Sequence, residues 1–298
     1  MPTRRRSVIA AGGGLLGVCG VGLSTLSTAG DRDPASGHSR LVVGTTLYDS
    51  GLAEELAAAV AETCPHLAPA PVPRGTGAAL RALAAGDVAA AIVHHPRAER
   101  RAVATGDAVD RRPFCVNDFL LVGPPGDPAG AADATDAAAA FDEVAAAGER
   151  FLSRGDDSGT HARERRIWDA ADRDSHGDWY GETGSSMGET LRIAGSVGAY
   201  TLVDRGTFLA RRGTVDLETA FATGLDSPSE LLRNVYSVLR PPPDRVDEAG
   251  VAAGRAIAET LAGDPGREAV RGFRADGERA YRPVEGTDSS DRRRSVKP

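Results

Sequence analysis

Within the segment from Ser153 to Ala171, SRGDDSGTHARERRIWDAA, the eight residues 154–161 crowd an arginine, two aspartates, a serine, a threonine and a histidine beside two glycines. A helix-like run follows directly. These residue types can serve three kinds of chemistry: catalysis by a serine with a histidine base, metal binding through histidine and carboxylates, or anion binding by arginine, hydroxyls and backbone N–H groups. Which of these applies depends on what the other polar segments of the chain contribute.

Three other segments place hydroxyls or glycines immediately before a helix-like run. They are Thr45-Thr46 with Asp49-Ser50-Gly51, Arg74 to Gly77, and Thr183 to Ser186. The free N–H groups and the positive dipole end of a helix N-terminus attract anions, and glycine permits close approach. Any one segment alone can be only a helix cap. Four together predict a neutral, donor-rich cage with one or two arginines, which suits a small anion.

Two other readings of the same residues are weaker. In a serine hydrolase, Ser158 would be the nucleophile and His161 the base, but GDDSGTH lacks the G-x-S-x-G elbow and no third orienting group is evident. A metal site would use His94 and His95 with Asp156 and Asp157. Adjacent histidines at the end of a strand point to opposite faces and seldom chelate together. An extracytoplasmic serine hydrolase that uses Ser158 and His161 is the alternative function.

Strand-like and helix-like segments alternate along the chain and must position these groups. The expected strands are RLVVGTT, VAAAIVHH, NDFLLVGPPG, ERFLSRG, GAYTLV and NVYSVL. The expected helices are SGLAEELAAAVAETC, GTGAALRALAAG, residues 159–171, SSMGETLRIAG, DRGTFLARRG and AGVAAGRAIAETLAG. This alternation predicts an α/β fold with mainly parallel sheets, which bind ligands beyond the carboxyl ends of their strands.

Length and charge limit the class of protein. The 298 residues, 41% of them hydrophobic, suffice for two packed lobes or one large α/β domain. The net charge is -7, and Lys297 is the only lysine. Because this balance is acidic, nucleic acid is not an expected partner.

The N-terminus has the layout of an export signal: three arginines, Arg4 to Arg6, precede an uncharged run from Ser7 to Gly30. The arginines resemble a twin-arginine signal, with a plain transmembrane anchor as the alternative. Cys19 in LLGVC is a candidate for lipid anchoring, although valine replaces the usual small residue before it. We therefore expect an exported, extracytoplasmic protein.

The remaining cysteines, Cys64 and Cys115, are too few for a zinc ligand set. We expect buried thiols, with a single disulfide as the alternative. The C-terminal EGTDSSDRRRSVKP has the composition of a disordered tail.

An ordered set of motifs resembles the substrate-binding component of tungstate ABC importers. The resemblance runs from Leu41 to Leu209, and SRGDDSGTH followed by GAYTLVDRGT is its specific signature. The other matching motifs are GTTLYDSGL, RGTGAALRALAAGDVAAAIVHHPRAE, RRPFCVNDFLLVGPPGDPAG, WY and SSMGETLRIA. Two departures are the short GTTL, where the family has a longer Thr and Ser run, and Val235, where it usually has proline.

The resemblance implies a type II periplasmic binding protein with two lobes, a Venus-flytrap fold and a hinge. It implies a non-enzymatic, monomeric receptor without a cofactor or metal, which holds tungstate as an oxyanion, or its nearest competitor molybdate. The receptor would deliver the anion to an ABC permease and its ATPase. The expected division is 1–38 for signal and tether, 39–117 plus 234–283 for lobe 1, 118–233 for lobe 2, and 284–298 for the tail.

The resemblance also assigns the ligand-binding residues. The first lobe would contribute Thr45, Thr46 and Thr76, and the second Arg154, Ser158, Thr160, Ser185 and Ser186. Arg154 would be the cationic contact, while Thr160 and the helix start near Gly159 would donate hydrogen bonds. Ser158 would cap the helix or add a donor. Because carboxylates repel a dianion, Asp156 and Asp157 would orient Arg154 or pair across the cleft, and His161 would be structural.

Overall fold

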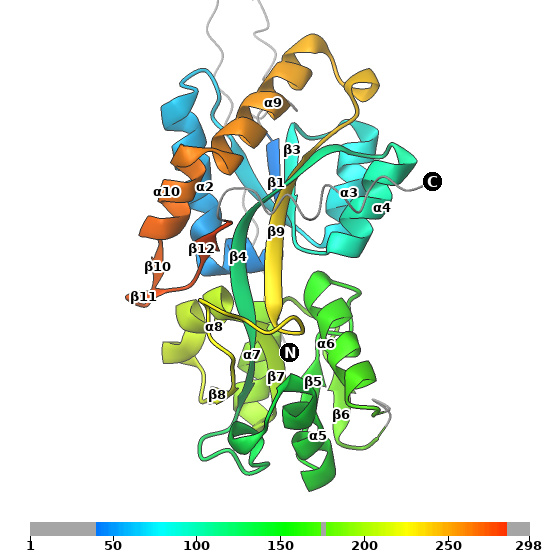
Figure 1. Ribbon diagram of the computed structural model, residues 1–298, viewed down its shortest axis with the longest axis vertical. Helices are drawn as coiled ribbons and strands as arrows, with labels where there is room; N and C mark the ends of the chain where they lie inside the picture. The colour runs from blue at the N-terminus through cyan, green and yellow to red at the C-terminus, as the bar shows by residue number, and fades with distance from the viewer. Residues whose placement is uncertain (1–39, 174–176, 285–298) are drawn as a thin grey trace, which may run out of the picture. The chain divides into compact units, whose positions relative to one another are not determined.

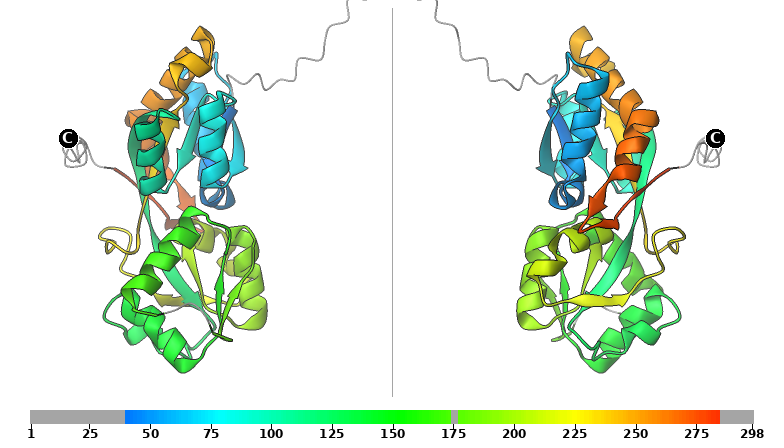
Figure 2. Two further views of the ribbon diagram at one scale, coloured as in Figure 1. Left: turned by 90° about the vertical axis from the view of Figure 1, so that its right-hand side faces the viewer. Right: turned by 90° about the vertical axis from the view of Figure 1, so that its left-hand side faces the viewer.

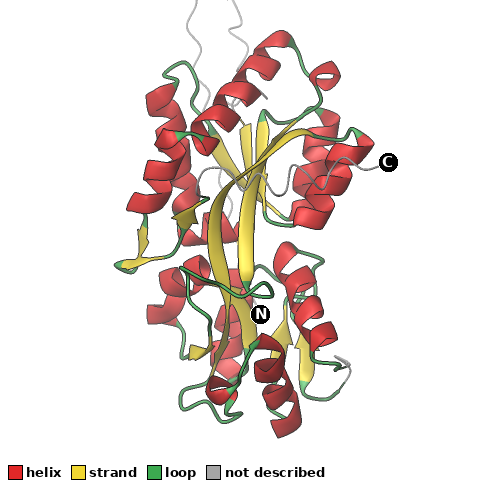
Figure 3. Ribbon diagram, viewed as in Figure 1, coloured by secondary structure: helices red, strands yellow, loops and turns green. Residues whose placement is uncertain are grey.

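The computed structural model describes residues 40–173 and 177–284 (Figure 1). The predicted export signal, Cys19, the tether and residues 285–298 of the predicted tail lie outside this part of the chain. Helices alternate with strands through most of it, as expected (Figure 3). No helix within it is long and apolar enough to span a bilayer.

The first three strands form the parallel part of the main sheet. β1 (Arg40–Gly44) pairs in parallel with β2 (Ala70–Arg74) on one side and with β3 (Ala90–Val93) on the other. Leu41 and Val43 pack in one core cluster, whereas Val42 packs in another. Because successive strand residues point to opposite faces, β1 is buried on both sides.

Helices cover both faces of these strands (Figures 1 and 2). α2 (Leu52–Thr63), α9 (Glu248–Ala262) and α10 (Asp264–Gly272) contribute apolar residues to the cluster that contains Leu41 and Val43. On the other face, α3 (Thr76–Ala85) and α4 (Pro96–Thr105) pack against Val42. The short strands β10 (Arg274–Ala275) and β11 (Glu278–Arg279) pair with each other, and β12 (Arg282–Pro283) pairs with β4.

Two long strands carry the sheet from one lobe into the other. β4 (Val109–Gly123) pairs antiparallel with β9 (Arg233–Arg240) from Val109 to Asp118. From Phe119 onward β4 pairs instead with β7 (Thr201–Asp204) and β8 (Glu218–Phe221), also antiparallel. The sheet is therefore more mixed than the alternation predicts, because β4 and β9 are not linked to their neighbours by parallel crossovers.

The second lobe repeats the two-sided pattern around the end of β4. Phe119 and Leu121 pack with α5 (Ala137–Ala147) and α6 (Gly159–Ala170), whereas Leu120 and Val122 pack with α7 (Met187–Val197) and α8 (Arg205–Arg211). β5 (Phe151–Ser153) and β6 (Tyr180–Glu182) form a parallel pair. Phe141, Phe151 and Trp168 make edge-on and tilted ring contacts in this core.

Several elements differ from the sequence expectation. The strand RLVVGTT ends at Gly44, and Thr45 already opens the short helix α1 (Thr45–Ser50). Gly51, with a φ of 88°, separates α1 from α2. Neither β2 nor α4 was expected, and β4 starts well before the predicted NDFLLV. Cys64 and Cys115 are free thiols, with Cys115 buried and Cys64 half-buried, so the disulfide alternative is wrong. The residue boundaries of the two lobes stay a prediction.

Candidate functional site

Two helices of the first lobe begin at a glycine. α1 follows Gly44 and α3 follows Gly75, and neither N-terminus receives a hydrogen bond from a capping side chain. Gly44 lies opposite Arg74 in the β1–β2 register, so the two helices start at neighbouring strand ends. The first-turn N–H groups of both helices are therefore left to solvent or to a ligand.

The predicted threonines stand in the first turns of these helices. Thr46 and Thr76 are buried, and Thr45 is half-buried. Thr46 Oγ1 shares a hydrogen bond of 3.0 Å with the hydroxyl of Tyr236, in which either oxygen can donate. Among the described residues, no side-chain hydrogen bond links Thr76 to another predicted ligand residue. Thr76 is placed near α1 by the register of β1 and β2, which puts Arg74 opposite Gly44.

Two helices of the second lobe begin at a serine. Ser158 caps α6, its Oγ accepting the N–H of His161 at 3.3 Å, and Ser186 caps α7, its Oγ accepting the N–H of Glu189 at 3.4 Å. The capping expected of Ser158 is confirmed. Each hydroxyl still has its proton to donate.

Arg154 follows β5 and is fixed on two sides. Its side chain is 3% exposed, Nη2 pairs with Asp156 Oδ2 at 2.5 Å, and Nε donates to the carbonyl of Ser185 at 3.2 Å. The expectation that Asp156 orients Arg154 is confirmed. Nη1 is buried and has no hydrogen-bond partner among the described residues. One corner of the guanidinium is thus left with unsatisfied donors.

Thr160, in the first turn of α6, carries a second unsatisfied group. The residue is fully buried, and its Oγ1 has no partner within the described part of the chain. A buried polar group without a hydrogen bond costs about 1–3 kcal/mol, and such groups are rare in folded proteins. Arg154 Nη1 and Thr160 Oγ1 are both able to donate, so an anion would satisfy them and a metal cation would not.

His94 lies between the starts of α1 and α6. A Cβ placed on Gly44 would be 3.4 Å from the ring Cδ2, and one on Gly159 would be 2.7 Å from Cε1. Only glycine therefore lets α6 begin against this ring. His94 links one helix start of each lobe, a role that the sequence reading missed by weighing it only as a metal ligand.

The ring of His94 is neutral. Nδ1 donates to Asn234 Oδ1 at 3.0 Å, since the amide nitrogen of Asn234 already donates to Asn117 and Tyr236. Burial, together with the nearby charge of Arg154, lowers the pKa of His94 to about 3, against the hydrogen bond to Asn234. His94 adds no cationic charge.

The hydrogen bonds continue across the paired strands β4 and β9. Asn117 and Asn234 are register partners, and Asn117 Nδ2 donates to Asp204 Oδ1 at 3.2 Å. Asp204 caps α8 by accepting the N–H of Thr207, and burial raises its pKa to about 6. His94 is therefore connected to α8 through residues of both long strands.

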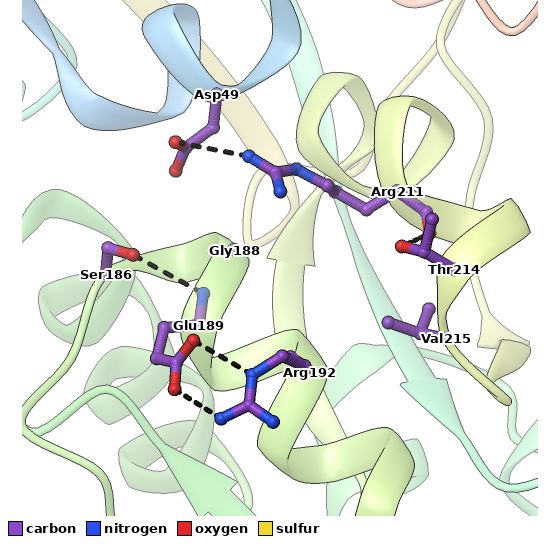
Figure 4. Close-up of a pocket in the computed structure, with 8 residues that line it drawn as sticks. All are labelled: Asp49, Ser186, Gly188, Glu189, Arg192, Arg211, Thr214 and Val215. Carbon is purple, nitrogen blue, oxygen red and sulfur yellow. Dashed lines mark hydrogen bonds and ion pairs between the residues drawn. The ribbon is translucent and has the colours of Figure 1, made fainter.

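A pocket of about 280 Å³ lies where α1 approaches α7 and α8 (Figure 4). Oδ1 of Asp49, on α1, lies 3.9 Å from Nη2 of Arg211, on α8. Burial raises the pKa of Asp49. The charges of Arg211 and Arg154 and a hydrogen bond from the Gly188 N–H act in the opposite direction. The lining residues are Asp49, Ser186, Gly188, Glu189, Arg192, Arg211, Thr214 and Val215. Of the predicted ligand residues, only Ser186 belongs to this lining.

This geometry gives little support to the serine hydrolase and metal-site hypotheses. His161 Nδ1 accepts the N–H of Asp157 at 3.1 Å, and no hydrogen bond among the described residues joins its ring to the Ser158 hydroxyl. His95 caps α4 by accepting the N–H of Ala98. Residues 40–173 and 177–284 hold no group of three or more His, Cys, Asp or Glu side chains arranged for a metal ion.

Known proteins share both this sequence and this fold. Residues 29–255 match the PBP superfamily domain. A protein of Haloferax volcanii assigned as an ABC transporter anion-binding protein is 36% identical over 94% of this chain and 85% of its own. The tungstate-binding protein TupA of Peptoclostridium acidaminophilum is 32% identical over 80% of this chain and 85% of its own.

A solved structure described as the tungstate ABC transporter from Geobacter sulfurreducens superposes with a TM-score of 0.72. It is 34% identical and covers 78% of this chain and 97% of the other. The similarity therefore extends over both lobes and the strands between them. The chain belongs to the PBP superfamily of two-lobed periplasmic binding proteins and, within it, to the family of the tungstate-binding proteins.

Proposed function

We propose that this chain is the extracytoplasmic solute-binding protein of an ABC importer. It binds tungstate between its lobes and delivers the anion to a membrane permease with its ATPase. The observation that carries the proposal is the pair of buried, unsatisfied donors, Arg154 Nη1 and Thr160 Oγ1, beside helix N-termini. The identity of the anion rests on the names of the relatives.

In this proposal the negative charge of the ligand is stabilised mainly by the dipoles of helix N-termini. Arg154 is the one guanidinium among the predicted ligand residues, and Asp156 already neutralises part of its charge. The N–H groups at the starts of α1, α3, α6 and α7 supply the remaining positive potential. Donors come from Thr45, Thr46 and Thr76 on one lobe and from Arg154, Ser158, Thr160, Ser185 and Ser186 on the other.

Further properties belong to the same proposal. Molybdate, a tetrahedral dianion like tungstate, is the nearest competitor. The receptor acts as a monomer without catalysis or cofactor. It is exported through the twin-arginine-like signal, with Cys19 as a candidate lipid anchor.

Calorimetric titration with tungstate, molybdate, sulfate and phosphate tests the ligand. Tungstate should bind stoichiometrically and raise the thermal midpoint, since a ligand at about a hundred times its dissociation constant stabilises by about 2.7 kcal/mol. Sulfate at equal concentration should do little, and equal shifts with both would refute the assignment. Turnover of generic ester or phosphate substrates, lost in Ser158→Ala, would favour the hydrolase instead.

A further inference from the structure

A buried carboxyl group lies one helical turn from Thr160 of the predicted anion site. Glu164 is 1% exposed and stands four residues after Thr160 on α6. Residues four apart on a helix share a face, with about 5–6 Å between their Cβ atoms. Glu164 therefore lies one turn further along α6 than Thr160, on the same face of the helix.

Glu164 also contacts the end of β5, the strand that directly precedes Arg154. The hydroxyl of Tyr180 donates to Glu164 Oε1 at 2.8 Å, and the side chain of Ser153 forms a hydrogen bond to the same carboxyl group. Ser153 Oγ accepts the N–H of Gly155 at 3.1 Å, so its own proton can be donated to Glu164 or to the neighbouring oxygen of Tyr180. These contacts hold the residues on either side of Arg154.

No cation compensates the charge of this carboxylate. Glu164 takes part in no ion pair among the described residues, while Arg154 pairs with Asp156. The groups around Glu164 are Ser153 from β5, Tyr180 and Glu182 from β6, and Trp168 from α6. Burial, together with the negative charge of Glu182, raises the pKa of Glu164 to about 7, against the polar contacts from Ser153, Tyr180 and Trp168.

We propose that Glu164 is a positioning residue for the Arg154 segment and that it takes up a proton when the oxyanion binds. The proposal rests on the function proposed above. An anion at Thr160 and Arg154 brings negative charge toward a buried carboxylate, and like charge favours the protonated form. The neutral carboxyl group can still accept the hydroxyl protons of Ser153 and Tyr180.

The sign of the pH dependence follows. Below about pH 7 Glu164 is protonated with and without ligand, so affinity is high and constant. Above about pH 7 the free protein loses this proton and the complex retains it, so binding takes up a proton and affinity falls as pH rises. The decline ends above the pKa of Glu164 in the complex.

The test is calorimetric titration with tungstate from about pH 6 to about pH 9, in buffers of different ionisation enthalpy. The wild-type protein should show proton uptake that grows above about pH 7 and affinity that falls there. Glu164→Gln keeps the shape of the side chain and, like the protonated carboxyl group, has one carbonyl acceptor and a donor group, but it cannot titrate. It should show no such uptake and a flat profile, which also corrects for protonation of tungstate itself.

Two further variants separate this role from a merely structural one. Tyr180→Phe removes a hydrogen bond that lowers the pKa of Glu164, so the pH window should move upward. Glu99→Gln changes another buried glutamate whose pKa is raised by burial, but which pairs with Arg111 at 2.7 Å, and it should leave the profile unchanged. Equal proton uptake in wild type and Glu164→Gln would overturn the proposal while leaving tungstate binding intact. Absence of tungstate binding at every pH would instead overturn the proposed function.

Discussion

The helices of the two lobes differ in how their N-termini are capped. α1 and α3 of the first lobe begin at Gly44 and Gly75 without a capping side chain. α6 and α7 of the second lobe begin at Ser158 and Ser186, whose hydroxyls accept backbone N–H groups of the first turn. The first lobe therefore offers uncapped N–H groups, whereas the second offers fixed side chains.

This difference predicts that the two lobes offer different kinds of hydrogen-bond donor to the anion. In the second lobe the caps and the Asp156 contact fix the segment that carries Arg154 and Thr160, so their unsatisfied donors are preorganised. In the first lobe the donors are mainly backbone groups, which glycine allows a ligand to approach closely. Variants of the second lobe should thus alter affinity more strongly.

The largest effect is expected for Arg154. Arg154→Ala removes the main counter-charge and should weaken tungstate binding by roughly 2 to 5 kcal/mol, as for one partner of a buried charge pair. Arg154→Lys should retain part of the affinity but discriminate less among oxyanions, since lysine lacks the planar fork. Arg165→Ala, which changes an exposed arginine of α6, is the control for calorimetry. Parental affinity in a folded Arg154→Ala protein would mean that this arginine is not a ligand contact.

Thr160 should separate affinity from stability. Thr160→Val removes one donor and should cost about 1–3 kcal/mol of binding, yet the unliganded protein should not lose thermal stability, because the hydroxyl has no partner. Thr201→Val is the control: its hydroxyl donates to the carbonyl of Leu152 at 2.7 Å. That variant should lose stability and keep its affinity. The reverse pattern in denaturation and calorimetry would contradict the assignment of Thr160.

The serine cap of α6 should matter chiefly for stability. Ser158→Ala removes the acceptor of the His161 N–H and should lower the free energy of unfolding by roughly 0.5–2 kcal/mol. Denaturant titration measures this. Affinity should fall less than in Arg154→Ala. An unchanged free energy of unfolding would show that the cap is not needed to hold the first turn of α6.

The smallest effect should come from giving the first lobe a cap of the second lobe's kind. Gly75 has φ -65° and ψ 153°, and a Cβ there would meet no atom within 4 Å. Gly75→Ser should gain a few tenths of a kcal/mol of stability and lose some tungstate affinity, as its hydroxyl competes for the α3 N–H groups. Gly75→Ala should leave the affinity unchanged. Equal affinity of both variants would remove α3 from the anion site.

The sequence predicted well what is local and poorly what is distant. Ser158 as a cap and Asp156 beside Arg154 follow from residues two or three positions apart. Asn234 lies 140 residues from His94, so no spacing rule could indicate their hydrogen bond. The sequence predicted only part of β4 because Asp110, Arg111 and Arg112 near its start are charged and half-buried. The antiparallel pairing of β4 with β9 likewise joins segments that are far apart in the sequence, so the hydrophobic pattern of either strand does not indicate it.

A crystal structure of the protein with tungstate, located by the anomalous scattering of tungsten, tests the central claim most directly. The account predicts one tetrahedral anion with oxygens at about 2.7–3.2 Å from both Arg154 Nη1 and Thr160 Oγ1, reached also by N–H groups of the first lobe. An ordered tungstate elsewhere, such as in the pocket between Arg192 and Arg211, with both donors still unsatisfied, would contradict it.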